Sequence, residues 1–231
     1  MRRLIDGAPL FGIAGAYWLG GWVARLVARP SADFLLREWD LRLFGAIPGL
    51  WMQQHLPRPA LDGLELFYFS YYLFVPLAPL LIFVRHGRTG LWQLWISGGL
   101  AYAVCDLISP WFPSTPPRLL WSGFASGGWP QAMNLFVLNR FSIGANVFPS
   151  SHVAGTTAFA LCHCRHGSCW FLPWALGIAA STVSGGYHYG VDAAAGIAAA
   201  LAADWGGAEI FRRLRTSRTK ALEQRPAPKS N

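Results

Sequence analysis

The residues best suited to chemistry in this chain are two histidines and an aspartate in its second half. His188 and Asp192 are four positions apart, which on a helix places them on one face within hydrogen-bonding reach. A carboxylate that binds one imidazole nitrogen fixes the tautomer and raises the basicity of the other nitrogen. His188 is therefore a candidate nucleophile toward phosphorus, with Asp192 as the residue that orients it.

The second histidine, His152, follows a Pro-Ser-Ser turn at the expected start of a helix. Free backbone N–H groups and the positive end of the helix dipole lie at such a start and favour a bound anion. We expect Ser150 and Ser151 to contact the anion. The imidazole of His152 is placed to protonate a leaving oxygen as general acid.

Two arginines are candidate ligands for a phosphate. Arg118 offers a planar fork that matches phosphate oxygens, on which negative charge accumulates in the transition state. Arg140 lies in the same loop and is a second candidate phosphate contact, with a solvated loop charge as the alternative. Asp106 faces either the site or a separate polar pocket, and the sequence favours neither.

The composition around these residues indicates a membrane protein. Hydrophobic residues make up 53% of the chain and charged residues 13%, against about 25% charged residues in typical soluble domains. We predict an all-α bundle of six transmembrane helices within residues 1–214, followed by a basic, disordered tail over residues 215–231. The predicted spans are Pro9–Val27, Leu66–Val84, Leu91–Ile108, a segment that begins after Pro149 and ends near Cys164, Trp170–Tyr187 and Val191–Phe211.

The basic residues predict the orientation of these spans. The net charge is +8, but many of the basic residues lie in the tail, so we expect no nucleic-acid partner. A basic tail after the last span is typical of a cytoplasmic segment. Both termini are then cytoplasmic, and the candidate site opens to the non-cytoplasmic face. The residue usage points to a multi-pass protein of a bacterial plasma membrane, and the oligomeric state is not indicated.

A group of cysteines and histidines raises the alternative of a metal site. Cys162, Cys164 and Cys169 lie close to His163 and His166 in the sequence. Their spacing matches no strong zinc pattern. We expect no metal there and interpret the cysteines as small thiols at a helix end.

The histidine motifs resemble those of the type-2 phosphatidic acid phosphatase superfamily. That family carries Lys-x6-Arg-Pro, then Pro-Ser-Gly-His, then Ser-Arg-x5-His-x3-Asp. The second motif corresponds here to Pro149–His152 and the third to Ser181–Asp192, with the spacing kept. The resemblance implies a six-helix bundle, a phosphohistidine on His188, Asp192 as its orienting residue and His152 as general acid. It also implies a lipid-linked phosphate substrate and neither a metal nor another cofactor.

The chain departs from the family pattern at three positions. Trp111 stands in place of the lysine, Leu119 in place of the proline, and Thr182 in place of the second arginine. The forms at Pro113–Pro117 and His188–Asp192 are more similar to the inositol phosphorylceramide synthase branch. Three functions therefore stay open: a lipid phosphatase, a phosphotransferase that moves a head group such as phosphoinositol onto a lipid alcohol, and a non-catalytic lipid carrier or scaffold.

Overall fold

The structure is a computed structural model that describes residues 2–27, 29–124, 128–142 and 148–223. Within these ranges every regular element is helical, which confirms the predicted all-α class. The elements are α1 (Arg2–Val27), α2 (Asp33–Phe44), α3 (Pro48–His55), α4 (Arg58–Phe69), α5 (Tyr71–Ile108), η1 (Ser109–Trp111), α6 (Pro117–Leu120), η2 (Ser122–Phe124), α7 (Trp129–Phe141), α8 (Ser151–Arg165), α9 (Phe171–Ser184) and α10 (Gly190–Glu223).

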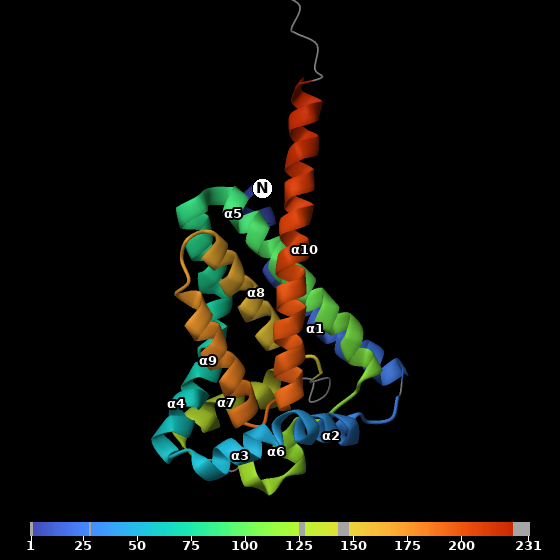
Figure 1. Ribbon diagram of the computed structural model, residues 1–231, viewed down its shortest axis with the longest axis vertical. Coiled ribbons are helices and arrows are strands. Elements are labelled where there is room, and N and C mark those ends of the chain that lie inside the picture. The colour runs from blue at the N-terminus through green and yellow to red at the C-terminus, as the bar shows by residue number, and fades with distance from the viewer. Residues whose placement is uncertain (1, 28, 125–127, 143–147, 224–231) are drawn as a thin grey trace, which may run out of the picture.

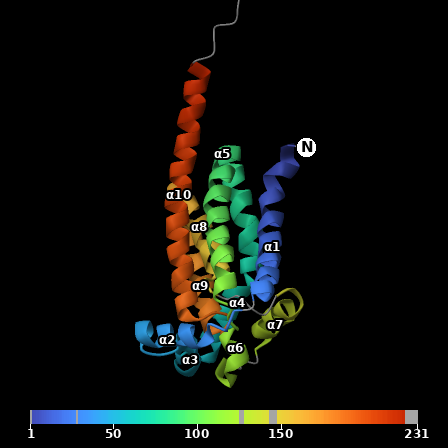
Figure 2. The same cartoon turned by 90° about the vertical axis from the view of Figure 1, so that its right-hand side faces the viewer.

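The long helices form an elongated bundle. α5 reverses direction at Gly87, whose φ of 62° and ψ of −160° are not helical, so α5 is two antiparallel arms (Figure 1). A positive φ of this kind is tolerated by glycine because it has no Cβ atom. α5 packs against α1, α8 and α10, and α9 packs against α8 (Figures 1 and 2).

The core of the bundle lies around α8. This helix is almost entirely buried and packs against α5, α9 and α10. Small residues allow the close approach of neighbouring helices. A Cβ atom on Gly98 would collide with the ring of Phe159, and one on Gly155 with the ring of Tyr102. These two glycines therefore let the second arm of α5 and α8 pack in contact.

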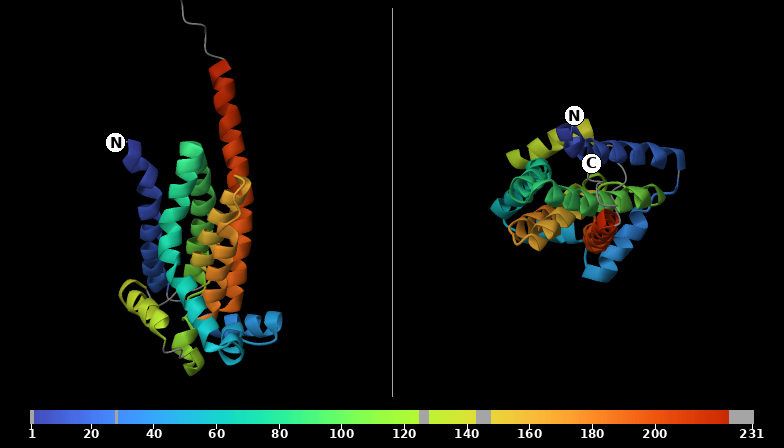
Figure 3. Two further views of the ribbon diagram at one scale, coloured as in Figure 1. Left: turned by 90° about the vertical axis from the view of Figure 1, so that its left-hand side faces the viewer. Right: turned by 90° about the horizontal axis from the view of Figure 1, so that it is seen from above.

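Short helices cover one end of the bundle. α2, α3 and α7 lie across this end, while the N-terminus and the exposed end of α10 lie at the opposite end (Figure 3). α2 and α3 leave large apolar side chains exposed, among them Leu43, Phe44 and Trp51. We refer to this as the capped end of the bundle, and to the other as the termini end.

The helix lengths do not reproduce the prediction of six spans. Two segments, Asp6–Val27 and Tyr71–Trp111, are long and apolar enough to cross a membrane among the described residues. α8 and α9 have 15 and 14 residues, which gives them lengths of about 21–23 Å against a hydrocarbon core of about 30 Å. The number of spans therefore stays a prediction.

The structure differs from the predicted tail at its beginning. α10 continues past Leu214 to Glu223, in a segment predicted to be disordered. The residues from Arg212 to Glu223 include many good helix formers and no proline, so the helix continues without a break. The rest of the predicted tail, residues 224–231, lies outside the described residues.

Candidate active site

His188 and Asp192 lie together at the capped end of the bundle. The Nδ1 atom of His188 is 3.4 Å from Oδ2 of Asp192, and both side chains are buried. The same Oδ2 accepts the backbone N–H of Tyr189 at 2.8 Å. Asp192 is therefore held in place by the backbone and supports the Nδ1 side of the imidazole.

The local geometry of this pair differs from the prediction. The spacing predicts two residues on one face of a helix, but His188 precedes α10, which begins at Gly190. The turn before it contains Gly186 with a φ of 65°. The backbone N–H groups of Tyr187 and His188 both donate to the carbonyl of Thr182 at 3.0 Å. A turn, together with the first turn of α10, brings the carboxylate to the imidazole.

A buried acid that the motifs do not include fixes the start of α10. Both carboxylate oxygens of Asp40, on α2, accept backbone N–H groups, from Gly190 at 3.0 Å and from Val191 at 2.7 Å. Burial raises the pKa of Asp40, and the two backbone hydrogen bonds oppose this shift. Asp40 therefore caps the helix that follows His188.

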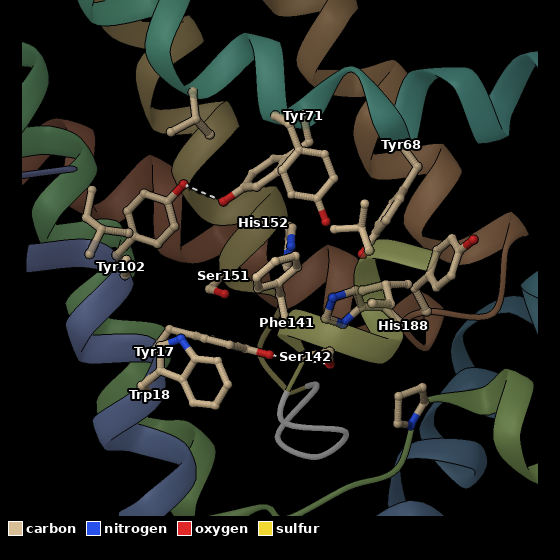
Figure 4. Close-up of a pocket in the computed structure, with 18 of the residues that line it drawn as sticks. Tyr17, Trp18, Tyr68, Tyr71, Tyr102, Phe141, Ser142, Ser151, His152 and His188 are labelled. Carbon is tan, nitrogen blue, oxygen red and sulfur yellow. Dashed lines mark hydrogen bonds between the residues drawn. The ribbon is translucent and has the colours of Figure 1, made fainter. Parts of the chain in front are cut away.

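His152 lies opposite His188. It is in the first turn of α8, and its ring centroid is 5.8 Å from that of His188. The ring also packs against Tyr71, with centroids 4.4 Å apart, and against Tyr68, at 5.9 Å. Figure 4 shows His152 and His188 facing the same space between the helices.

Two backbone hydrogen bonds connect the three sequence motifs. The N–H of Arg118 donates to the carbonyl of Gly186 at 2.9 Å, and the N–H of Ser150 donates to the carbonyl of Asp192 at 3.1 Å. Each bond joins segments that are far apart in the sequence. The relative positions of the motifs therefore depend on main-chain contacts as well as on helix packing.

The guanidinium group of Arg118 is held by an aromatic ring. Its Cζ atom lies 5.2 Å from the ring centroid of Tyr187. The Tyr187 hydroxyl donates to Oε2 of the buried Glu65 at 2.7 Å, and Asn134 donates to the same oxygen at 2.6 Å. Burial raises the pKa of Glu65, and these two hydrogen bonds oppose the shift. Arg118 has no carboxylate partner among the described residues, so its charge is available to an anion.

These residues surround a cavity of about 310 Å³. Arg118, Ser151, His152 and His188 all line it. Asp106 also lines it, which answers the question that the sequence left open for this residue. The remaining wall is largely aromatic and includes Tyr17, Trp18, Tyr68, Tyr71, Tyr72, Tyr102, Phe141 and Tyr187.

Two of the predicted phosphate ligands are placed elsewhere. Arg140 is exposed, its guanidinium lies 3.7 Å from the ring centroid of Phe136 on its own helix, and it is not among the residues that line the cavity. Ser150 is fully buried, and its Oγ accepts the N–H of Val153, so it caps α8. Ser151 is the serine of the pair that reaches the cavity.

The positions where the family has further cations contribute none here. Thr182 is buried, and its hydroxyl donates to the carbonyl of Ala179. Trp111 is 55% exposed and stacks with Arg29 at 5.0 Å. Among the described residues that line the cavity, Arg118 is therefore the sole arginine or lysine.

The cysteine and histidine group lies at the termini end, far from this cavity. Cys164 and Cys169 form a disulfide, and Cys162 is a buried free thiol. No group of three or more His, Cys, Asp or Glu side chains within the described ranges is arranged to hold a metal ion.

The arrangement suits attack on a phosphorus atom between the two imidazoles. Nδ1 of the His188 ring faces Asp192, so Nε2 is the nitrogen on the opposite side of the ring and is our candidate for bonding to phosphorus. His152 stands across the same cavity, and Arg118 supplies positive charge there. Fixed donors and charges of this kind lower the barrier when negative charge develops on phosphate oxygens.

Comparison with known proteins identifies the family pattern independently of this geometry. A sequence model of the family described as PAP2 superfamily matches residues 36–205 of the chain. The matched range contains all the cavity residues named above except those of α1. Neither the comparison with curated proteins nor that with solved structures gave a match.

Proposed function

Because the chain belongs to the PAP2 superfamily, whose members are phosphatases and phosphotransferases, we propose that it is a membrane phosphatase acting on a lipid-linked phosphate. The observation that carries this proposal is the position of the two histidines. Their ring centroids are 5.8 Å apart on one cavity that also contains a guanidinium without a carboxylate partner among the described residues.

The proposed reaction begins with in-line attack of His188 Nε2 on phosphorus. The N–P bond forms as the bond to the leaving oxygen breaks, and His152 donates its proton to that oxygen. Asp192 stabilises the positive charge on the His188 ring. His152 then removes a proton from water, whose oxygen attacks the phosphohistidine and releases phosphate. Arg118 stabilises the charge on the phosphate oxygens in both steps.

The proposed setting is a membrane with the capped end outward. α1, α8 and α10 pack against α5, and α9 packs against α8 (Figure 2). The start of α10, which follows His188, lies opposite the N-terminus and the basic end of α10 (Figure 2). Since basic segments remain on the cytoplasmic side, this arrangement supports a site on the non-cytoplasmic face.

The proposal is tested with purified protein in detergent and a panel of lipid phosphates. We expect phosphate release from at least one member, and a phosphorylated protein that is labile to acid when labelled substrate is quenched early. The His188→Ala variant should show neither product. If the wild-type protein forms no phosphoenzyme and releases no phosphate from any member, the carrier or scaffold function is favoured instead.

A second candidate is a phosphotransferase that uses a lipid alcohol in place of water. The observation in its favour is that Arg118 is the only arginine or lysine among the described residues of the cavity wall. The motifs of the hydrolytic family members have a lysine and a second arginine at the positions that Trp111 and Thr182 occupy here. Incubation with a phosphoinositide donor and a lipid alcohol separates the two functions. A new lipid that carries the phosphoinositol group supports transfer. Inositol phosphate from this donor, or inorganic phosphate from a lipid monoester, supports hydrolysis.

A further inference from the structure

Asp106 is a carboxylate in the cavity wall that the proposed phosphoryl chemistry does not use. It lies one helical turn after Tyr102 on the second arm of α5, so the two side chains project from the same face. Both residues line the cavity together with His152 and His188. The Oδ2 atom of Asp106 is buried and has no hydrogen-bond partner among the described residues.

Two tyrosine hydroxyls lie between this face of α5 and the histidines. The hydroxyl of Tyr71 is 3.2 Å from that of Tyr102, and the ring of Tyr71 packs on His152 at a centroid distance of 4.4 Å (Figure 4). Each hydroxyl has one donor and two acceptor positions. The hydroxyls of Tyr71 and Tyr102 therefore place polar groups between His152 and the part of the cavity wall that contains Asp106.

The charge and the unpaired oxygen of Asp106 limit the kinds of ligand group that it can bind. Its charge repels a phosphate, so it is not a phosphate ligand. A buried oxygen without a donor is costly, which calls for a hydrogen-bond donor from the ligand. A neutral hydroxyl fits this requirement and can also accept from a neighbouring tyrosine. An ammonium group fits less well, because Arg118 lines the same cavity.

We propose that Asp106 recognises a hydroxyl group of the substrate, accepting its hydrogen bond at Oδ2 beside the hydroxyls of Tyr71 and Tyr102. This inference rests on the proposed function, because it takes the cavity to hold a phosphorylated compound. The hydroxyl has two possible sources. It belongs either to the phosphorylated donor itself or to an alcohol that accepts the phosphoryl group.

If the hydroxyl belongs to an acceptor, Asp106 orients it for the second step. Before this step the hydroxyl donates to Oδ2 of Asp106, and at the step it turns its proton toward His152. His152 accepts the proton as the alcohol oxygen bonds to phosphorus and the N–P bond to His188 breaks. Asp106 itself gains no proton and acts as a positioning residue. Water lacks the alkyl group that would fix it in an aromatic cavity, so an oriented alcohol competes with it effectively.

The donor arm of the test uses two matched phosphate esters. One is a 1-acylglycerol 3-phosphate with its hydroxyl on the second carbon, and the other is the analogue with hydrogen in place of that hydroxyl. We expect the wild-type protein to prefer the hydroxyl-bearing ester in kcat/KM by about 10- to 100-fold, which Asp106→Leu abolishes. Asp106→Asn, which keeps the size and a weaker acceptor, should lose part of this preference.

The acceptor arm measures the products when a lipid alcohol is added. If the hydroxyl belongs to the acceptor, the two donors react equally, and Asp106→Leu lowers the ratio of phosphorylated lipid to inorganic phosphate by about tenfold or more. Glu209→Gln is the matched control, because it removes an exposed acid of α10 that pairs with arginines. It should leave both arms unchanged.

The inference is overturned if Asp106→Leu and Asp106→Asn change neither the donor preference nor the product ratio, or if they slow all reactions equally. Failure of the proposed function has a different outcome, namely no product from the wild-type protein. In that case we test the role of Asp106 by measuring the equilibrium binding of the two esters through the change in tryptophan fluorescence. Wild-type preference for the hydroxyl-bearing ester that is lost in Asp106→Leu supports the inference, and equal binding overturns it.

Discussion

α8 carries a histidine near each end, and the two lie in very different surroundings. His152, at the capped end, faces the cavity across from His188. His163, at the termini end, is 1% exposed, with Nε2 2.9 Å from the carbonyl of Ala78 and its ring stacked on Phe171 at 4.1 Å. Residue type alone therefore does not distinguish a candidate catalytic histidine from a structural one.

The arginines of the two ends differ in the same way. At the termini end, Nη1 of Arg165 is 2.9 Å from Oδ1 of Asp204, and Nη2 donates to Ser97 at 3.1 Å. At the capped end, Arg118 stacks on Tyr187 without a carboxylate partner among the described residues. The fold pairs Arg165 with a carboxylate, whereas it gives Arg118 no carboxylate partner among the described residues.

The largest expected effect comes from the histidine that faces the candidate phosphorus position. His188→Ala should lower kcat for phosphate release by at least about a thousandfold, because it removes the nucleophile. The control is His166→Ala at the termini end, where the ring bonds to Gln93. It should keep activity within about twofold. An equal loss of kcat in both variants would contradict the assignment of the catalytic histidine to the capped end.

A smaller loss is expected from the arginine of the cavity. Arg118→Ala should reduce kcat/KM by about 100-fold, since it removes a charge that stabilises the phosphate oxygens. Arg140→Ala is the matched control, because this exposed side chain packs on its own helix. Steady-state kinetics that gave Arg140→Ala the greater loss would reverse the assignment of these two arginines.

His163, the structural histidine, should affect stability and leave activity unchanged. His163→Ala removes a buried hydrogen bond and a stacked ring, so the free energy of unfolding in detergent should fall by about 1–3 kcal/mol. Specific activity of the folded protein should stay within about twofold. Denaturant titration measures the first quantity, and phosphate release after removal of aggregates measures the second. A stable but inactive variant would contradict the assignment.

The smallest effect concerns the buried acid behind Arg118. Burial raises the pKa of Glu65 above its usual value of 4.5, so its contribution to stability is largest below that pH and is lost as the pH rises. As the pH rises from 4 to 7, the Tm of the wild-type protein should therefore fall relative to the Tm of Glu65→Gln by about 2–4 °C. A relative rise in the Tm of the wild-type protein would mean that the fold stabilises the charged form of Glu65.

The motif residues show how far prediction from the sequence extends. The family resemblance and the all-α class are confirmed. The spacing of His188 and Asp192 predicts their contact, although a turn before α10 produces it in place of one helical face. Asp40 and Glu65 could not be predicted as supports of the site. Their partners are more than 60 residues away in the sequence, and local patterns carry no information about such contacts.

The sequence by itself determined which groups are available for chemistry, because residue types and short spacings are local properties. Two imidazoles, a carboxylate and an arginine in family motifs are enough to indicate phosphoryl transfer. The tertiary structure decided which of the remaining polar residues reach the cavity. It turns Arg140 onto its own helix, uses Ser150 as a cap, and places Asp106 in the cavity wall. The direction of a side chain depends on how helices distant in the sequence pack together, and only the folded bundle specifies that packing.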